Sequence, residues 1–305
     1  MKAISYERFG GPEVLALGET ATPEPGPGEV RVKVVAAGVN PLDHKRREGW
    51  VEQFYPTTFP AVPGLEFAGV VDALGEGATG FAVGDEVFGW TRTGAYAEYA
   101  IAGDIVHKPA GLSFEEAAAL PVAGETAQRV LDLLEVRGGE TLLLHGAAGV
   151  VGQVAVQLAV ALGVTVVGTA SPANHDFLRE LGAVPVAYGD GLRDRVRAVA
   201  PGGNVDAVFD AAGHDTLPVS IELRGGTTDR IVTIAATDAD AYGIPFSGGG
   251  TPPEAVRAGL AEQGRLAAAG RLRVRIAETF ALADAAKAQE LSQAGHARGK
   301  LVVRP

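Results

Sequence analysis

The sequence predicts a two-domain α/β protein, in which an all-β, barrel-like domain is followed by a doubly wound parallel sheet. Its 305 residues are enough for two domains at roughly 100–200 residues each. Residues 1–110 alternate short runs of Val, Ile, Phe and Tyr with Gly and Pro clusters, a pattern typical of strands and turns. From about residue 123, strand-like runs alternate with helical stretches, which predicts right-handed crossovers between parallel strands.

The first domain is expected to consist of short strands joined by turns. Turn clusters such as Thr22–Gly28 cannot lie inside strands, because Pro donates no hydrogen bond to a neighbouring strand. Ser113 and Glu116 have the spacing of a capping box, so a helix is predicted to begin there. The predicted strands are Lys2–Arg8, Glu29–Ala37, Glu66–Leu74, Asp85–Phe88 and Ala95–Ile101.

The second domain is expected to alternate strands and helices up to a glycine-rich loop at Gly243–Pro253. A helix over Pro253–Ala269 and a last strand at Lys300–Arg304 are predicted after this loop. The other predicted strands are Thr141–His145, Val164–Thr169, Val184–Tyr188, Ala207–Asp210 and Arg230–Ile234, and the other predicted helices are Val150–Leu162 and Asn174–Leu181.

The composition excludes several classes of function. A net charge of −11 disfavours a nucleic-acid partner, because such binding depends on clustered Lys and Arg. The chain has no Cys, which removes disulfides, thiolate nucleophiles and Cys-ligated metal sites. No apolar run approaches the ~20 residues of a membrane span, and the N-terminal residues lack the basic and apolar stretches of a signal peptide. We therefore expect a cytoplasmic protein with no membrane partner.

The most informative stretch is a glycine-rich turn between a strand and a helix. The apolar run that ends at His145 leads into a Gly-x-x-Gly-x-x-Gly sequence formed by Gly146, Gly149 and Gly152, and the helix follows at once. Small residues let the backbone approach a pyrophosphate closely, and the helix N-terminus offers N–H groups to the phosphates. This context predicts a dinucleotide site. The alternative is a tight strand-to-helix turn with no ligand.

The end of the next strand indicates which dinucleotide binds. An NAD site has an acidic residue there that holds the ribose 2′-hydroxyl. The run from Val166 to Ser171 carries no carboxylate, and Asp176 lies well inside the following helix. Ser171 and Asn174 could donate hydrogen bonds to a 2′-phosphate, with His175 and Arg179 as nearby cationic candidates. We therefore predict NADP(H) in preference to NAD(H).

Motifs along nearly the whole chain resemble one family. The chain resembles the medium-chain dehydrogenase/reductase superfamily, in particular its zinc-independent NADPH:quinone oxidoreductase branch. The resemblance implies a GroES-like β-barrel catalytic domain over residues 1–122 and 270–305, a Rossmann NADP(H)-binding domain over residues 123–269, and a homodimer. The matching stretches are Ala37–Asp43, Pro63–Val71, Phe81–Val87, Leu120–Ala127, Gly146–Gly152 and Gly295–Val302.

Departures from the family pattern bear on metal and cofactor. Zinc alcohol dehydrogenases of this superfamily carry a Cys where Asn40 stands and a His where Leu65 stands, and the zinc-binding lobe of four cysteines is missing. The six histidines show no metal-ligand spacing, so we expect no metal site. Val150 replaces a usual Gly of the glycine loop, and Glu125 replaces a usual apolar residue beside Thr126.

Without a metal to polarise a carbonyl, hydride from a reduced nicotinamide needs an electron-poor acceptor such as a quinone or an enone. The resemblance implies catalytic roles for Asn40, Asp43 and Tyr55. Structural roles remain open for all three: a turn residue for Asn40, a helix N-terminal or salt-bridge role for Asp43, and a packing role for Tyr55. Neighbouring Lys45, Arg46 and Arg47 are expected to form a solvated helix face.

The resemblance also implies a set of cofactor contacts. Thr126 is expected near the nicotinamide, and Ser171 and Asn174 near the 2′-phosphate. The remaining contacts are Gly146, Ala148, Gly149, Val150 and Val151 at the pyrophosphate, Tyr188 on the adenosine side, and Arg298 and Lys300 in a tail that returns to the cofactor cleft. Three functions stay open: an NADPH-dependent quinone reductase, an NADPH-dependent reductase of enones or enals, and an NADPH-binding sensor or structural protein with little turnover.

Overall fold

The computed structural model describes residues 1–295 and 297–305, so that His296 lies outside the described residues. The chain forms two compact units, one of Met1–Val122 with Pro253–Pro305 and one of Ala123–Pro252. Helix α8 (Pro253–Ala268) therefore belongs to the first unit, which differs from the boundary expected after residue 269. The reason is a long-range contact, because Gly264 of α8 packs so closely on the ring of Phe88 that an added Cβ would lie 2.8 Å from its Cζ atom.

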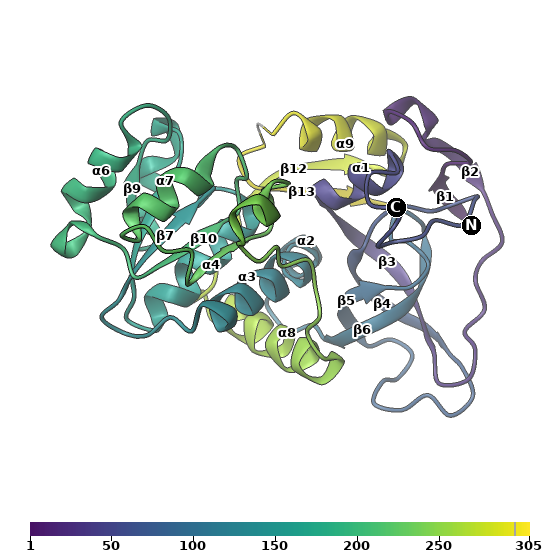
Figure 1. Ribbon diagram of the computed structural model, residues 1–305. Coiled ribbons are helices and arrows are strands. Elements are labelled where there is room, and N and C mark those ends of the chain that lie inside the picture. The colour runs from purple at the N-terminus through teal and green to yellow at the C-terminus, as the bar shows by residue number, and fades with distance from the viewer. Residues whose placement is uncertain (296) are drawn as a thin grey trace. The chain divides into compact units, whose positions relative to one another are not determined.

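The first unit is built on a six-stranded sheet of order β12-β13-β3-β4-β5-β6. Strand β3 pairs with both β4 and β6, which closes four of the strands into a barrel (Figure 1). Alternate residues of these strands point inward, among them Val32, Phe67 and Val87, and form the apolar core. The strands are β3 (Val30–Val39), β4 (Glu66–Leu74), β5 (Glu86–Thr91), β6 (Tyr99–His107), β12 (Ile276–Ala281) and β13 (Lys300–Arg304), and a separate antiparallel pair is formed by β1 (Lys2–Ser5) and β2 (Ala16–Glu19).

Short helices accompany this barrel. Helix α2 (Phe114–Ala118) begins at the predicted capping box, where Ser113 Oγ accepts the Glu116 amide at 3.2 Å and the Glu116 carboxylate accepts the Ser113 amide at 3.0 Å. Helices α1 (Pro41–Arg47) and α9 (Ala285–Gln293) pack on each other. The 3₁₀ turns among the described residues are Pro12–Val14, Pro172–Asn174, Pro201–Gly203, Ala239–Tyr242 and Leu282–Asp284.

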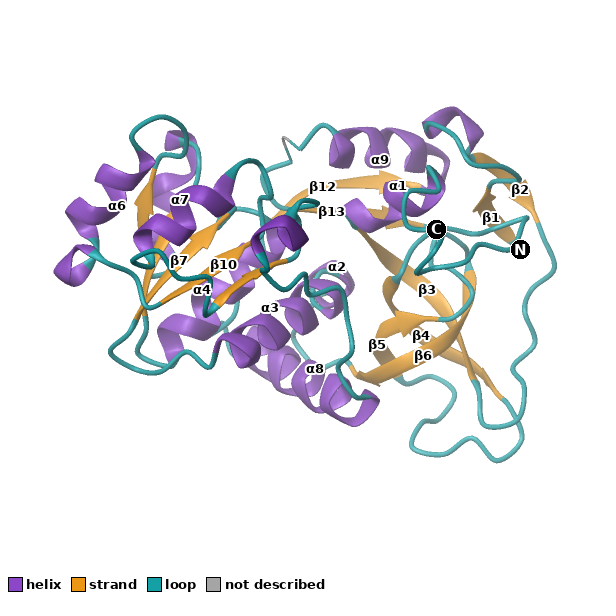
Figure 2. Cartoon of the chain, viewed as in Figure 1, coloured by secondary structure: helices purple, strands orange, loops and turns teal. Residues whose placement is uncertain are grey.

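The second unit is a five-stranded parallel sheet of order β11-β10-β7-β8-β9. Figure 2 labels β7, β9 and β10 of this sheet. The chain starts in the middle of this sheet, runs to one edge and then returns to build the other half, which is the doubly wound arrangement that was predicted. The order in which strands are added reverses between β7 and β10, which are neighbours in the sheet. The strands are β7 (Thr141–His145), β8 (Thr165–Thr169), β9 (Val184–Val186), β10 (Ala207–Asp210) and β11 (Ile231–Thr233).

Helices cover this sheet because its strands are apolar on both faces. One face packs residues such as Leu143, Val167 and Val208 against α6 (Leu192–Val199) and α7 (Thr216–Leu223). The remaining helices of this part of the chain are α3 (Pro121–Leu134), α4 (Val150–Ala161) and α5 (His175–Glu180). No helix among the described residues is long and apolar enough to cross a membrane.

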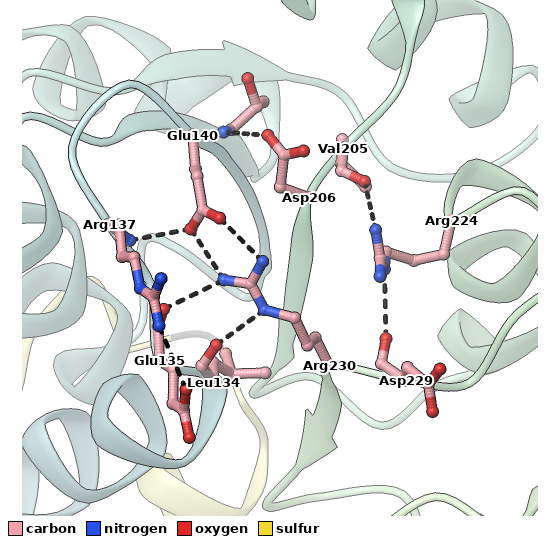
Figure 3. A network of polar contacts seen from close by, with 10 residues as sticks. Leu134, Glu135, Arg137, Glu140, Val205, Asp206, Arg224, Asp229 and Arg230 are labelled. Atoms are coloured by element: carbon pink, nitrogen blue, oxygen red, sulfur yellow. Dashed lines mark hydrogen bonds and ion pairs between the residues drawn. The ribbon is translucent and has the colours of Figure 1, made fainter.

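An ion-pair network ties the amino edge of this sheet to the end of α3 (Figure 3). The Arg230 guanidinium donates to both oxygens of Glu140, at 2.8 and 2.7 Å, and to the carbonyl oxygens of Leu134 and Glu135. These bonds from Arg230 lower the pKa of Glu140 to about 2. Glu140 and Arg230 directly precede β7 and β11, so the network lies at the end of the sheet opposite to the glycine loop.

Several predicted strands agree with the structure residue for residue, namely Glu66–Leu74, Thr141–His145, Ala207–Asp210 and Lys300–Arg304. The strand expected at Ala95–Ile101 instead runs from Tyr99 to His107. Its position is set by pairing with β5, in which Val87 lies opposite His107. Helices α6 and α9 and strand β12 had not been predicted, and α6 carries three Arg and one Asp whose side chains hide its narrow apolar stripe.

Candidate functional site

The predicted site residues fall into two groups, one in each unit, and each group is described by itself. In the second unit, the glycine loop connects β7 to α4. Gly146 has a φ of +72°, which favours glycine, and a Cβ at Gly152 would lie 2.7 Å from Ala147 Cα. A side chain would fit neither position without strain or a shift of the backbone, so the two glycines allow α4 to pack closely on the turn.

The start of α4 offers backbone N–H groups to a ligand. The first hydrogen bond of the helix runs from the Gln153 amide to Gly149 O at 2.8 Å. The amides of Val150, Val151 and Gly152 come before this first donor, so they belong to the N-terminal turn, whose N–H groups have no acceptor within the helix. Gly149, the residue before the helix, has no side chain that could cap these amides. The arrangement suits an anionic group such as a pyrophosphate.

Two polar residues behind the loop serve the fold. Burial lowers the pKa of His145 to about 4, so its ring is neutral, and Nε2 lies 3.0 Å from Ser220 Oγ. Asp210, which ends β10, accepts the amides of Ala212 and Gly213 at 3.0 and 2.9 Å. Both residues stabilise the carboxyl edge of the sheet.

The structure brings Ser171 and Asn174 together after β8. Asn174 Nδ2 donates to Ser171 Oγ at 3.1 Å, and both residues are partly exposed. Asp176 points away, because its side chain is 96% exposed and pairs with Arg179 at 2.6 Å. His175 Nε2 lies 3.2 Å from Ala170 O. The end of β8 therefore presents a hydroxyl and an amide in place of a carboxylate.

Tyr188 follows β9 and its side chain is exposed. Its loop is fixed by Arg195, which donates to the carbonyl oxygens of Ala187 at 2.9 Å, Asp190 at 2.8 Å and Gly189 at 3.0 Å. Arg195 was not among the residues predicted from the sequence. Its only signal was an Arg placed shortly after a glycine-rich turn, which is too common a pattern to be informative.

In the first unit, Asn40 lies at the centre of a buried polar cluster. Its Nδ2 donates to Glu66 Oε1 at 2.7 Å, and its Oδ1 accepts from Lys300 Nζ at 2.7 Å. Lys300 also forms an ion pair with Glu66, and neither side chain of this pair is exposed. The second oxygen of Glu66 accepts the Val122 amide at 2.7 Å. The amide orientation of Asn40 is thus set by one acidic and one basic partner.

Asp43 extends this cluster from the first turn of α1. Its Oδ2 accepts the Asn40 amide at 2.8 Å and the Tyr96 hydroxyl at 3.2 Å. Burial raises the pKa of Asp43 to about 6, although the Asn40 amide and the Lys300 charge oppose this effect. Burial also raises the pKa of Tyr96 well above its usual value, so its hydroxyl remains a donor. By accepting the backbone amide of Asn40, Asp43 fills the helix N-terminal role that the sequence left open.

The other predicted residues differ in exposure. Tyr55 is 37% exposed and its ring lies 5.8 Å from Arg46 Cζ. Arg298 is exposed, whereas Lys300 is used inside the first unit, and a cofactor contact for either remains a prediction. The Thr126 hydroxyl donates to Glu125 at 3.4 Å.

The expectation that Arg47 belongs to a solvated face is wrong. Its side chain is fully buried and donates to Gly10 O at 3.0 Å, Gln289 Oε1 at 2.6 Å and Glu48 Oε1 at 2.7 Å. Helix α9 covers this side of α1 and supplies the glutamine. Elsewhere, no group of three or more His, Cys, Asp or Glu in the described part of the chain could hold a metal ion.

Comparisons with known proteins agree with this architecture. A family model described as an alcohol dehydrogenase GroES-like domain matches residues 26–121, and one described as a zinc-binding dehydrogenase matches residues 181–303. A quinone oxidoreductase of Pseudomonas aeruginosa is 36% identical, over 100% of this chain and 99% of that protein. The solved quinone oxidoreductase from Coxiella burnetii matches with a TM-score of 0.88 and 36% identity, over 100% of this chain and 99% of that one.

Two further solved structures bear on cofactor and acceptor. A mycobacterial protein complexed with NADPH has a TM-score of 0.86 and 29% identity, and covers 100% of both chains. The CurK enoyl reductase has a TM-score of 0.88 and 25% identity, over 99% of this chain and 98% of that one.

Proposed function

Because this chain belongs to the medium-chain dehydrogenase/reductase superfamily and is an oxidoreductase, we propose that it transfers hydride from NADPH to a quinone without a metal. The observation that carries the cofactor assignment is the carboxylate-free end of β8, where Ser171 and Asn174 lie together beside the glycine loop. The acceptor class is supported by the quinone oxidoreductases that match the whole chain.

Residues of the second unit would hold the cofactor. The amides of Val150 and Val151 suit its pyrophosphate, and the hydroxyl of Ser171 and the amide of Asn174 suit a 2′-phosphate, since both can donate. Bound NADPH would supply the hydride. The protein's own contribution is to orient the nicotinamide and to exclude competing reactions.

In the first unit, Asn40 is the donor that we propose for the acceptor oxygen. Its amide group has two N–H bonds, and Glu66 uses one of them. Because Lys300 holds Oδ1, the amide cannot flip without losing both partners. A fixed N–H can stabilise negative charge that develops on a quinone oxygen during hydride transfer. Tyr55, which is partly exposed, is a second proposed donor.

The test is anaerobic oxidation of NADPH and NADH with a panel of quinones and enones, followed at the nicotinamide absorbance. We expect turnover with NADPH and quinones. In the variant Ser171→Asp, repulsion between the new carboxylate and the 2′-phosphate should lower kcat/KM for NADPH by roughly tenfold or more. Asn174→Lys is the matched opposite change and should lower the KM for NADPH. Equal use of NADH and NADPH by the unaltered protein would refute the cofactor assignment.

A second candidate is reduction of an enone, enal or related double bond, which the similarity to the CurK enoyl reductase favours. The same panel separates the two, because only one acceptor class should be turned over efficiently. Tight NADPH binding without turnover on any acceptor would instead support a sensor or structural role. The homodimer and the cytoplasmic location remain predictions.

A further inference from the structure

The glycine-rich loop after β11 is attached at both ends to one ion pair on α3. Glu125 and Arg129 form a salt bridge at 2.7 Å, and their side chains are only 12% and 9% exposed. Arg129 donates to Ser247 Oγ, and Thr251 Oγ1 donates to Glu125 Oε1 at 2.6 Å. Ser247 and Thr251 bracket the span Gly248–Gly250. We call these two bonds and their ion pair the loop clamp.

Two of the three glycines, Gly249 and Gly250, have little packing around them. All three glycines are exposed, and an added Cβ at Gly249 or Gly250 would meet no atom within 4 Å. Gly250 has a φ of +104°, which a residue with a side chain rarely adopts. The path of Gly249 and Gly250 therefore depends strongly on the residues that flank them, among them the two that the clamp holds.

The clamped loop begins at the same edge of the sheet as the glycine loop. The Ser247 amide donates to Thr233 O at 2.8 Å, and Thr233 is the last residue of β11. The parallel register places Thr233 beside Asp210 of β10, and Asp210 beside His145 of β7. His145 directly precedes the glycine loop. In doubly wound sheets this carboxyl edge is where ligands bind.

The position along this edge indicates which half of a dinucleotide the loop faces. The pyrophosphate is expected at α4, between β7 and β10, and the adenosine half over β8, where Ser171 and Asn174 lie. The other half must then extend toward β10 and β11. Thr126, the residue predicted near the nicotinamide, donates to the carboxylate of the clamp residue Glu125 at 3.4 Å.

We propose that the Glu125–Arg129 pair is a positioning element that holds Gly248–Gly250 beside the nicotinamide half of NADPH and so limits which acceptors reach it. This inference rests on the proposed function, and it accounts for one departure from the family pattern, the acidic residue at position 125. The clamp residues themselves transfer neither hydride nor proton.

The loop bonds can be cut without altering the ion pair. In the double variant Ser247→Ala/Thr251→Val both hydroxyls are lost while side-chain volume is nearly kept. Thr279→Val, a matched change on the exposed face of β12, is the control. Deuterium exchange of amides in residues 246–251 should accelerate by about tenfold or more in the double variant, since each lost bond joins a hydroxyl to a charged group. The control should leave this exchange unchanged.

Kinetics and binding then separate a positioning role from a purely structural one. We expect kcat/KM for the best quinone to fall by roughly tenfold, with affinity for 2′,5′-ADP, a probe of the adenosine half, kept within about twofold. Faster exchange with unchanged acceptor kinetics would overturn the positioning role, and unchanged exchange would overturn the clamp itself. If the unaltered protein fails to bind 2′,5′-ADP, the NADPH assignment fails and this inference with it, whereas the exchange data on the unliganded protein still report the clamp.

Discussion

Replacing Lys300 by Met should destabilise the first unit strongly. The side chains of Lys300 and Glu66 are both fully buried, and Lys300 also donates to Asn40 Oδ1. The substitution keeps the side-chain length but leaves the Glu66 carboxylate without its charged partner. Removing one member of a buried ion pair costs about 3–5 kcal/mol. At roughly 2–4 °C per kcal/mol for a unit of this size, the melting temperature should fall by about 10 °C.

A second substitution checks that the cost comes from the unpaired charge. In Lys300→Met/Glu66→Gln the buried group is neutral, and its amide can still accept the Val122 amide and bond to Asn40. The double variant should recover a large part of the lost stability, about 2 kcal/mol or more, because the desolvated charge is gone.

The assay is urea and thermal unfolding at pH 7, followed by far-ultraviolet circular dichroism and tryptophan fluorescence. A Lys300→Met variant that melts within 2 °C of the unaltered protein, or a double variant less stable than Lys300→Met, would refute the reasoning. Activity provides a second readout, since removing the Lys300 charge should raise the pKa of Asp43 further and free the Asn40 amide to rotate.

Three other outcomes follow from the contacts. Glu140→Gln should lower the free energy of unfolding at pH 7 by about 1–2 kcal/mol, discounted for the partial exposure of the side chain. The stability difference from the unaltered protein should vanish as pH falls from about 4.5 to about 2, the window set by the lowered pKa of Glu140. The pH dependence of stability that Asp43 causes has the opposite sign, because the pKa of Asp43 is raised from 3.8 to about 6. Relative to Asp43→Asn, the unaltered protein should gain up to ~3 kcal/mol of unfolding free energy as pH falls through this window, measured by urea unfolding at several pH values. Gly152→Ala should abolish NADPH binding, measured by calorimetry, because its Cβ would lie 2.7 Å from Ala147 Cα. In the control Gly259→Ala of α8 the Cβ would meet nothing within 4 Å, so this variant should keep NADPH binding and gain about 0.5–1 kcal/mol of stability. Equal NADPH affinity of the two variants would contradict the role of the close packing.

The sequence alone determined the features that depend on near neighbours along the chain. The strand of the glycine loop, the helix after it and the capping box at Ser113 rest on propensity, spacing and turn chemistry, which are local properties. The missing carboxylate after β8 could likewise be read directly, because the residue concerned follows a strand whose position was predicted. The same reasoning missed α6, since its polar face outweighs a narrow apolar stripe.

The tertiary structure decided which distant side chains meet. Lys300 reaches Glu66 and Asn40 across 234 and 260 residues of sequence, and Arg47 reaches Gln289 across 242. No periodicity or spacing encodes such pairings, because they depend on how β13 and α9 pack against β3 and α1. For the same reason Arg47, which was expected to be solvated, is buried, and the side chain of Asn40 is held by the Lys300–Glu66 ion pair. Local interactions set the elements of this protein, and long-range packing set the environment of its functional side chains.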